Sequence, residues 1–301
     1  MSLLSRSLYT ICALITLTGS VTAQSGPPTP KQHHFMFMQY SPGNRIVELS
    51  DEGKVLWEHP IPSLAVMFKV LKGGHVMYAY GGNPTGVQEV DRDHKVVWDY
   101  KAKCEQVLGF DLLPNGNILV GEQGPCQAVE VNRKGEEVHV TALTTQEKGA
   151  HRQLRSIHKL KNGDLLGCHE GDAMVREVSP AGSVVWEYGP VDSVFDAIRL
   201  KNGNTLIAAG TQARIIEITP DKKIVWEFGA KDAPDLGLTW ITGLQMLKNG
   251  NIVAANFLRG NEGKGVHAFE VTRDKRVLWT FANHQMSTLV TMAKFLDEPE
   301  R

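Results

Sequence analysis

The stretch LKNGNTLIAAG at residues 200–210 places the dipeptide Asn202-Gly203 between two apolar runs. Similar stretches occur three more times, as LPNGNILVGEQ at 113–123, LKNGDLLGCHE at 160–170 and LKNGNIVAANF at 247–257. Asn-Gly between short apolar runs is a strong β-hairpin signal, because both residues tolerate a positive φ. The recurrence of one hairpin predicts that the chain repeats a single β unit.

Two further features recur in step with this hairpin. A Glu followed by an aliphatic residue occurs six times, at spacings of 41, 41, 47, 40 and 53 residues: Glu48, Glu89, Glu130, Glu177, Glu217 and Glu270. Nine residues later five copies have a Trp, and the third has His139: Trp57, Trp98, Trp186, Trp226 and Trp279. A period of about 40–50 residues with four short strands per copy is typical of β-propeller blades. We expect each Trp to pack between blades, and each Glu to have a structural partner, either a backbone group or an Arg or Lys.

The two ends of the chain complement each other. HFMFMQYS at 34–41 matches the second strand of a repeat, and STLVTMAKFLDEP at 287–299 matches a first strand. The C-terminal strand should therefore join the N-terminal blade and close the ring, which leaves no open sheet edge between first and last blades. The predicted fold is all-β: a six-bladed propeller of four-stranded antiparallel blades, forming a single domain over residues 35–301.

The N-terminus has the pattern of an export signal. Residues 1–23 contain Arg6, an apolar run at 8–17 and small residues at 21–23, which together indicate a cleavable signal peptide. Residues 24–34 then read as a flexible leader. We expect a secreted or periplasmic protein with no membrane span after cleavage, because the apolar run is short for a span. The net charge of -1 argues against a nucleic-acid partner.

Three cysteines follow the predicted cleavage point. Cys104 precedes the first strand of the third blade, and Cys126 lies in a loop expected at the same end of that blade. Export permits disulfides, so we predict a Cys104–Cys126 bond, with two separate buried thiols as the alternative. Cys168 lies in an apolar strand and is expected to be a core residue.

Several repeat segments resemble a known group of propellers. EVSPAGSVVWEYG at 177–189 and EITPDKKIVWEFG at 217–229 resemble the tryptophan-docking repeats of pyrroloquinoline-quinone (PQQ) type propellers. Together with LKNGNTLIA they are most similar to bacterial arylsulfotransferase-like propellers. The resemblance covers about residues 35–296 and implies the fold. It also implies two activities, sulfuryl transfer through a nucleophilic His and quinone-dependent oxidation with PQQ and calcium. The chain has no adjacent Cys-Cys pair and is two blades shorter than the larger quinone enzymes, so no cofactor is expected and PQQ with calcium stays an alternative.

The strand order predicts where a site would form. One face of the ring, here the turn face, carries the Asn-Gly turns. The opposite face, here the connection face, carries the blade-to-blade connections and the loops between second and third strands. Sites in propellers commonly form on the connection face at the axis. The insertion FLRGNEGKG at 257–265 should project from this face beside Trp240.

The fourth blade departs most from the repeat, with AHRQLRSIHKL at 150–160 and GCHEGD at 167–172. The candidate catalytic residues are His151 and His158. The candidate ligand-binding residues come from several blades: Arg152, Arg155, His169, Asp196, Arg214, Trp240, Asn256 and His267.

Three interpretations of this set stay open. It forms a hydrated channel without chemistry, an anion pocket with Arg152 and Arg155 as donors, or a metal site from His151, His169 and Glu170. We commit to no metal. The leading functional hypothesis is a binding module that recognises a small anionic molecule, or a protein or glycan partner, at its axial connection face. The alternatives are an arylsulfotransferase-like enzyme and, third, a PQQ-dependent oxidoreductase.

Overall fold

The computed structural model describes residues 32–40 and 43–298. These residues belong to a compact unit, Lys31–Arg301. The predicted signal peptide at 1–23, and the predicted leader up to residue 31, lie outside the described residues. Within the described part of the chain, no helix has the length and apolarity needed to cross a membrane.

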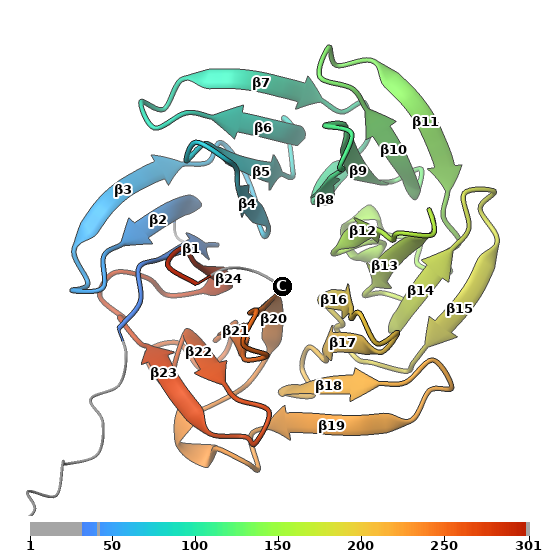
Figure 1. The fold of residues 1–301 in the computed structure, drawn as a ribbon. Helices are drawn as coiled ribbons and strands as arrows, with labels where there is room; N and C mark the ends of the chain where they lie inside the picture. The colour runs from blue at the N-terminus through green and yellow to red at the C-terminus, as the bar shows by residue number, and fades with distance from the viewer. Residues whose placement is uncertain (1–31, 41–42, 299–301) are drawn as a thin grey trace, which may run out of the picture. The chain divides into compact units, whose positions relative to one another are not determined.

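Six four-stranded antiparallel sheets surround a common axis, so the prediction of a six-bladed propeller is confirmed (Figure 1). The strands of blade one, from the axis outward, are β24 (Val290–Phe295), β1 (Phe35–Gln39), β2 (Arg45–Leu49) and β3 (Val55–Pro60). Blade two consists of β4 (Phe68–Val70), β5 (Val76–Tyr80), β6 (Gly86–Val90) and β7 (Val96–Lys101). Blade three consists of β8 (Gln106–Leu112), β9 (Ile118–Gln123), β10 (Gln127–Val131) and β11 (Glu137–Ala142).

The other three blades follow the same order. Blade four consists of β12 (Ile157–Lys159), β13 (Leu165–His169), β14 (Met174–Val178) and β15 (Val184–Tyr188). Blade five consists of β16 (Asp196–Arg199), β17 (Thr205–Ala208), β18 (Arg214–Ile218) and β19 (Ile224–Gly229). Blade six consists of β20 (Ile241–Met246), β21 (Ile252–Asn256), β22 (Ala268–Val271) and β23 (Val277–Phe281). Two single-turn 3₁₀ helices precede inner strands, η1 (Ala150–Arg152) and η2 (Pro234–Leu236).

The ring closes as the sequence predicts. The last strand, β24, pairs antiparallel with β1, with Phe295 opposite Phe35. The side chain of Gln245 on β20 also joins blade six to blade one: its Nε2 donates to the Phe295 carbonyl at 3.2 Å, and its Oε1 accepts from the Phe295 N–H at 2.8 Å. The first and last blades are thus joined by a strand ladder and by a buried side-chain bridge.

The repeated hairpin is formed, and only its Gly uses the positive φ that both turn residues tolerate. Gly203 has a φ of 87°, whereas Asn202 is not among the positive-φ residues. The Oδ1 of Asn202 accepts a hydrogen bond from the N–H of Asn204 at 3.1 Å. The Asn is there because its side chain caps the turn, and only the Gly supplies the left-handed conformation.

The recurrent Glu and Trp form a clamp between neighbouring blades, which confirms the structural role predicted for them. In blade five, Glu217 forms an ion pair with Arg273 of blade six. The same guanidinium lies over the Trp226 ring at 4.4 Å, and the Trp226 Nε1 donates to the Arg273 carbonyl at 2.8 Å. One arginine of the next blade thus neutralises the buried carboxylate and covers the indole. The same arrangement recurs in two further Glu, Arg and Trp sets: Glu48, Arg92 and Trp57; Glu89, Arg133 and Trp98. In blade four, Arg199 of the inner strand β16 pairs with Glu177 and covers Trp186, but the Trp186 Nε1 donates to the Pro220 carbonyl.

The residues before β1 also belong to the propeller. His33 is only 2% exposed, stacks on Phe295 with ring centroids 3.7 Å apart, and lies 3.4 Å from Glu270. His34 pairs with Glu48 at 2.7 Å. The predicted flexible leader at 24–34 therefore extends too far, because His33 and His34 belong to the propeller. His34 has the same role in blade one as His75 in blade two and Asn204 in blade five. Each of these side chains binds the recurrent Glu of its own blade.

The predicted Cys104–Cys126 disulfide is not formed, and both residues are free thiols. Cys104 packs against the core cluster shared by blades one to three, whereas Cys126 belongs to a cluster with Leu154 and Ile157 of blade four. The two side chains thus lie on opposite faces of the third sheet. The sequence correctly places both near one end of the blade but does not show which face each one occupies. Cys168 is fully buried, as expected.

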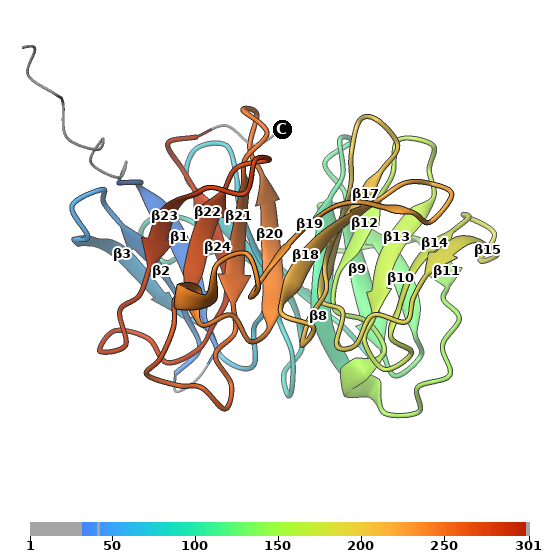
Figure 2. The same cartoon turned by 90° about the horizontal axis from the view of Figure 1, so that it is seen from below.

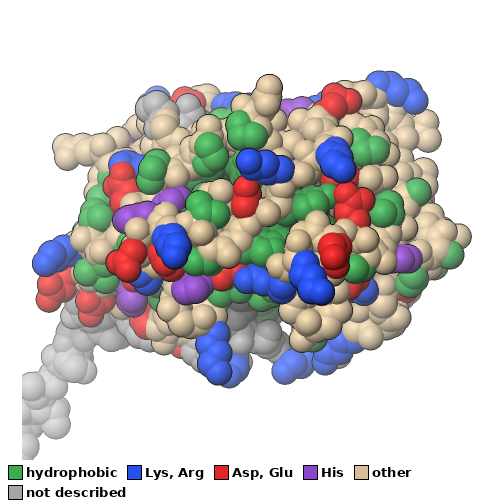
Figure 3. All heavy atoms as spheres, turned by 90° about the horizontal axis from the view of Figure 1, so that it is seen from above, with side chains coloured by type: hydrophobic (Ala, Val, Ile, Leu, Met, Phe, Trp, Pro, Cys, Tyr) green, Lys and Arg blue, Asp and Glu red, His purple; other side chains and the backbone are tan. Residues whose placement is uncertain are grey.

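The ring has the two predicted faces and an outer rim. Figure 2 shows the ring edge-on, with the turn face and the C-terminal end of β24 at the top and η1 at the bottom, on the connection face. The outer strands β3, β7, β11, β15 and β19 each expose two aliphatic side chains. On the rim seen in Figure 3, hydrophobic side chains alternate with charged ones.

Candidate functional site

The residues predicted from blade four fall into two groups at different depths along the axis. His151, Arg152 and Arg155 lie at or just after η1 on the connection face. His158 is the middle residue of β12 and contacts Asp196, the first residue of β16. The single site expected from the sequence is therefore two sites.

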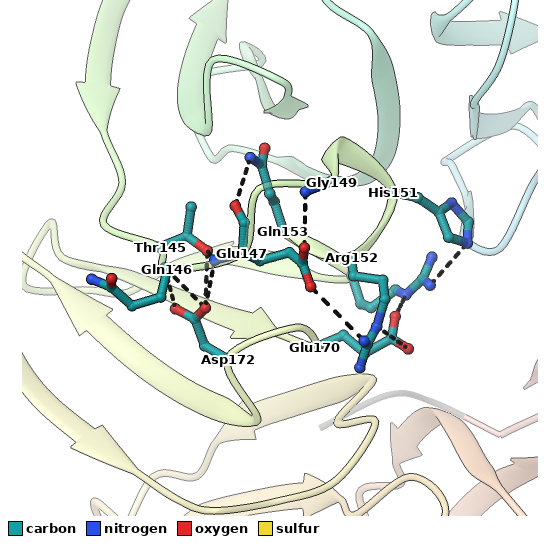
Figure 4. Close-up of polar contacts among 10 residues, drawn as sticks. Thr145, Gln146, Glu147, Gly149, His151, Arg152, Gln153, Glu170 and Asp172 are labelled. Atoms are coloured by element: carbon teal, nitrogen blue, oxygen red, sulfur yellow. Dashed lines mark hydrogen bonds and ion pairs between the residues drawn. The ribbon is translucent and has the colours of Figure 1, made fainter.

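The segment that carries the first group is fixed to the third and fourth blades (Figure 4). The side chain of Asp172 accepts hydrogen bonds from the backbone N–H groups of Gln146 and Glu147, both at 3.0 Å, and pairs with Arg176. The Gln153 Nε2 donates to the Glu147 carbonyl at 3.2 Å. These bonds hold the η1 segment on a rigid support, so its cationic side chains have defined positions.

Arg155 is the buried centre of this group. It is 5% exposed, and its Nε donates to Glu170 Oε2 in a buried ion pair. Arg152, whose side chain is half exposed, lies with its Nε 3.5 Å from the other Glu170 oxygen. Arg152 Nη1 also lies 3.8 Å from Glu147 Oε2, so the two guanidinium groups face two carboxylates (Figure 4). The further positive charge at this end of the axis comes from Arg259, which lies over Phe257.

The hydrogen bonds of His151 define its tautomer. Arg155 Nη2 donates to His151 Nε2 at 3.1 Å, and a guanidinium cannot accept a hydrogen bond. The proton therefore sits on Nδ1, which donates to Gln106 Oε1 at 2.8 Å. Burial and the nearby Arg155 lower the pKa of His151, with smaller contributions from Arg259 and Arg152. The imidazole is consequently neutral at neutral pH.

Aromatic side chains form the other wall of this end of the axis. Arg259, in the predicted insertion loop, lies over the rings of Phe257, Tyr40 and Trp240 at 5.2, 5.8 and 5.9 Å. The insertion therefore lies beside Trp240, as expected. These groups, with Arg155, line a small cavity, here called the connection-face recess. Its volume is about 30 Å³, which is room for about two water molecules.

The second group is a chain of charges along the inner strands. His158 Nε2 lies 3.2 Å from Asp196 Oδ1, and its Nδ1 lies 3.7 Å from Asp111 Oδ2. Asp111 also pairs with Lys69 at 2.8 Å, and the second oxygen of Asp196 accepts from the N–H of Leu244 at 3.1 Å. Burial alone would lower the pKa of His158, but hydrogen bonds to Asp111 and Asp196 raise it to about 9. The imidazole is therefore a cation held between two carboxylates, and both carboxylate pKa values are lowered.

Four of the predicted ligand-binding residues lie outside both groups. Asn256 binds backbone groups, accepting from the Thr239 N–H at 2.9 Å and donating to the Val266 carbonyl at 2.9 Å. Arg214 pairs with Glu227, toward the outer part of blade five. His267 is buried beside His284, with ring centroids 4.6 Å apart. His169 is also fully buried.

The two buried histidines are neutral. Burial, with Arg176 as the next cause, lowers the pKa of His169 to about 4. Burial and His284 lower the pKa of His267 to about 4. Among residues 32–40 and 43–298, no group of three or more His, Cys, Asp and Glu side chains could hold a metal ion. The alternative metal site of His151, His169 and Glu170 is thus not formed.

The sequence analysis missed three contributors to the connection-face site. Tyr40 and Phe257 supply aromatic wall, and Gln106 fixes the His151 tautomer. Phe257 begins the insertion already singled out at 257–265, so the insertion was the available signal. Tyr40 and Gln106 come from other blades, and nothing in their local sequence marks them.

No model of a known protein family matches the chain, and no curated protein sequence matches it. Solved structures do. The chain is similar to a protein of unknown function from Bacteroides caccae, at 24% identity and a TM-score of 0.78, covering 87% of this chain and 98% of that one. It is also similar to a streptogramin B lyase, at 13% identity and a TM-score of 0.59, covering 85% of each. A virginiamycin B lyase from Staphylococcus aureus matches at 10% identity and a TM-score of 0.57, covering 85% and 86%.

These matches establish the fold and not the activity. The chain is a six-bladed β-propeller that resembles the streptogramin B lyases and the Bacteroides protein in architecture. The resemblance found in the sequence is therefore confirmed at the level of the repeat propeller.

Proposed function

We propose that this protein is an exported binding propeller that recognises an anionic group of a small molecule, or of a protein or glycan partner, on its connection face. The carrying observation is the convergence of Arg152, Arg155 and Arg259 around His151. Arg155 and Glu170 form the buried base of the site, and the exposed guanidinium groups of Arg152 and Arg259 provide the donors. Guanidinium groups recognise carboxylate, sulfate and phosphate through paired N–H donors.

The aromatic wall favours a ligand with a planar part. Arg259 now covers the rings of Tyr40, Trp240 and Phe257, and the recess behind it holds only water-sized groups. The anionic group of the ligand therefore docks at the mouth of the recess. The planar part of the ligand takes the place of the Arg259 guanidinium against the Trp240 indole. Aromatic faces attract both cations and other rings, so this exchange keeps the stacking contact.

The state of the histidines supports binding over sulfuryl transfer. Nucleophilic attack needs a free imidazole lone pair. The His151 Nε2 lone pair accepts the hydrogen bond from Arg155, and its Nδ1 carries the proton. His158 is protonated at neutral pH and has no lone pair. Neither candidate nucleophile is ready to attack in this arrangement.

One probe tests both the proposal and the enzymatic alternative. We expect para-nitrophenyl sulfate to bind saturably in isothermal titration calorimetry, and to release no para-nitrophenol when phenol is added as an acceptor. Arg152→Gln and Arg259→Gln should each weaken binding several-fold. Arg155 is left unchanged, because its removal would leave the buried Glu170 carboxylate with only the half-exposed Arg152 as an ionic partner.

Arg276→Gln is the matched control. It removes the same charge from an exposed arginine whose side chain is 69% exposed and paired with Asp274. Equal binding by all three variants would refute the proposed site. Release of para-nitrophenol by the wild type, lost in His151→Ala, would replace the binding module with a sulfuryl transferase.

A further inference from the structure

A second cavity lies along the axis between the inner strands, from Met67 and Asp196 to Leu160 and Lys294 near the turn face. We call it the axial cavity. Its volume is about 210 Å³, several times that of the connection-face recess, and the two share no lining residue. Its polar lining comes from four different blades: Lys69, His158, Lys159, Asp196, Arg199 and Lys294.

The charge of this lining is predominantly positive. Five of these six side chains are basic, counting the protonated His158, and only Asp196 is acidic. Carboxylates outside the lining neutralise part of this charge: Asp111 pairs with Lys69, Glu130 with Lys159, and Glu177 with Arg199. These pairs fix the cations in place without filling the cavity, so the cavity has ammonium and guanidinium donors set around an open volume.

A further feature indicates an organic ligand rather than an inorganic ion. The rest of the cavity wall is apolar, with Leu244, Met67 and Met292 among its residues. An inorganic ion would leave this apolar surface against water.

The axial cavity adjoins a wider groove on the turn face. This groove, of about 590 Å³, lies between blades four and five and shares Lys159, Leu160 and Arg199 with the cavity. It adds two more basic residues, Lys161 and Lys201, from the Asn-Gly turns. A ligand approaching the axial cavity from this side therefore meets positive charge before it reaches the apolar interior, which favours entry of anions.

We propose that the axial cavity binds a small organic anion, with its acidic groups toward the basic side chains and its apolar body against Leu244, Met67 and Met292. Phthalate represents this chemistry, because it joins two carboxylates to one compact ring. The site does not depend on the connection-face proposal, since the two cavities share no lining residue, although the axial cavity begins next to the recess along the inner strands.

The test is titration of the full propeller with phthalate, followed by calorimetry and by the methyl resonances of isotope-labelled methionines. We expect saturable binding that shifts the Met67 and Met292 resonances. Lys294→Met should weaken binding at least about tenfold, or about 1.4 kcal/mol. Lys248→Met is the matched control, because Lys248 is an exposed lysine of an Asn-Gly turn on the same face and does not line the cavity. Lys69→Met is the second variant if Lys294→Met fails to fold.

Three results would overturn the inference. The first is no saturable binding to the wild type. The second is equal weakening by Lys294→Met and Lys248→Met, because that would reflect only the general charge of the face. The third is loss of phthalate binding in Arg259→Gln with full binding in Lys294→Met, which would place the anion on the connection face and leave the axial cavity without a ligand.

Discussion

His158 should make the stability of this propeller depend strongly on alkaline pH. Its pKa is raised from 6.5 to about 9 by the carboxylates Asp111 and Asp196, against the opposing effect of burial. A folded-state pKa above the unfolded value means that the folded protein binds the proton more tightly. The resulting stabilisation is fully present below about pH 6.5 and is lost as the pH rises through about 9. The size of the shift corresponds to about 3 kcal/mol.

The perturbation is His158→Gln, which keeps a hydrogen-bonding side chain and removes the titration. The assay is urea unfolding, followed by tryptophan fluorescence, of wild type and variant across this pH range. Both proteins share every other titrating group, so the difference between their unfolding free energies isolates His158. This difference should shrink by about 3 kcal/mol as the pH rises from about 6.5 to beyond 9. In the wild type, Asp111 and Asp196 stay ionised throughout, because Lys69 and His158 lower the first pKa and His158 lowers the second.

A control and a direct titration make the result decisive. His139→Gln removes an exposed histidine of the rim and should leave the pH dependence of the wild type unchanged. The His158 ring resonances should titrate near pH 9 in an NMR experiment. A midpoint near pH 6.5, or a wild-type-to-variant difference that is flat with pH, would refute the assignment of a cationic imidazole between two carboxylates.

Three further outcomes follow from the architecture. Glu217→Gln should lower the unfolding free energy by about 1–3 kcal/mol, because it breaks the ion pair with Arg273 of the next blade. Glu227→Gln, at an exposed position of the outer strand, should change the unfolding free energy by about 0.5 kcal/mol or less. Equal effects of the two variants in chemical denaturation would contradict the clamp. Removal of β24 should abolish cooperative thermal unfolding, since β1 would lose its inner partner, and a native-like transition in the shortened protein would contradict ring closure. Alkylation of urea-unfolded protein without reductant should modify both Cys104 and Cys126, and protection of the pair in the mass spectrum would show that they are bonded.

The repeat made the fold predictable. The wrong predictions concerned the partner of a side chain or the face of the sheet on which a side chain lies. Asn-Gly turns, recurrent Glu and recurrent Trp are local signals, so six blades and the closing strand followed from the sequence. His34 was placed in the predicted leader, although it pairs with Glu48 as His75 pairs with Glu89 in the next blade. The prediction of a Cys104–Cys126 bond was wrong for a related reason. The sequence indicates where each Cys lies along the blade, but not which face of the sheet its side chain occupies.

The candidate sites divide in the same way. The sequence by itself determined that blade four is the irregular blade and that His151, Arg152, Arg155 and His158 are its unusual residues. Only the tertiary structure decided that His151 and His158 belong to two different cavities along the axis, with Arg259 beside the first and carboxylates of two other blades enclosing the second. The physical reason is that strands and turns are specified by hydrogen bonds and periodicity within one repeat. The environment of an axial side chain, and with it the charge state of His158, is set by blades tens of residues away that meet only when the ring closes.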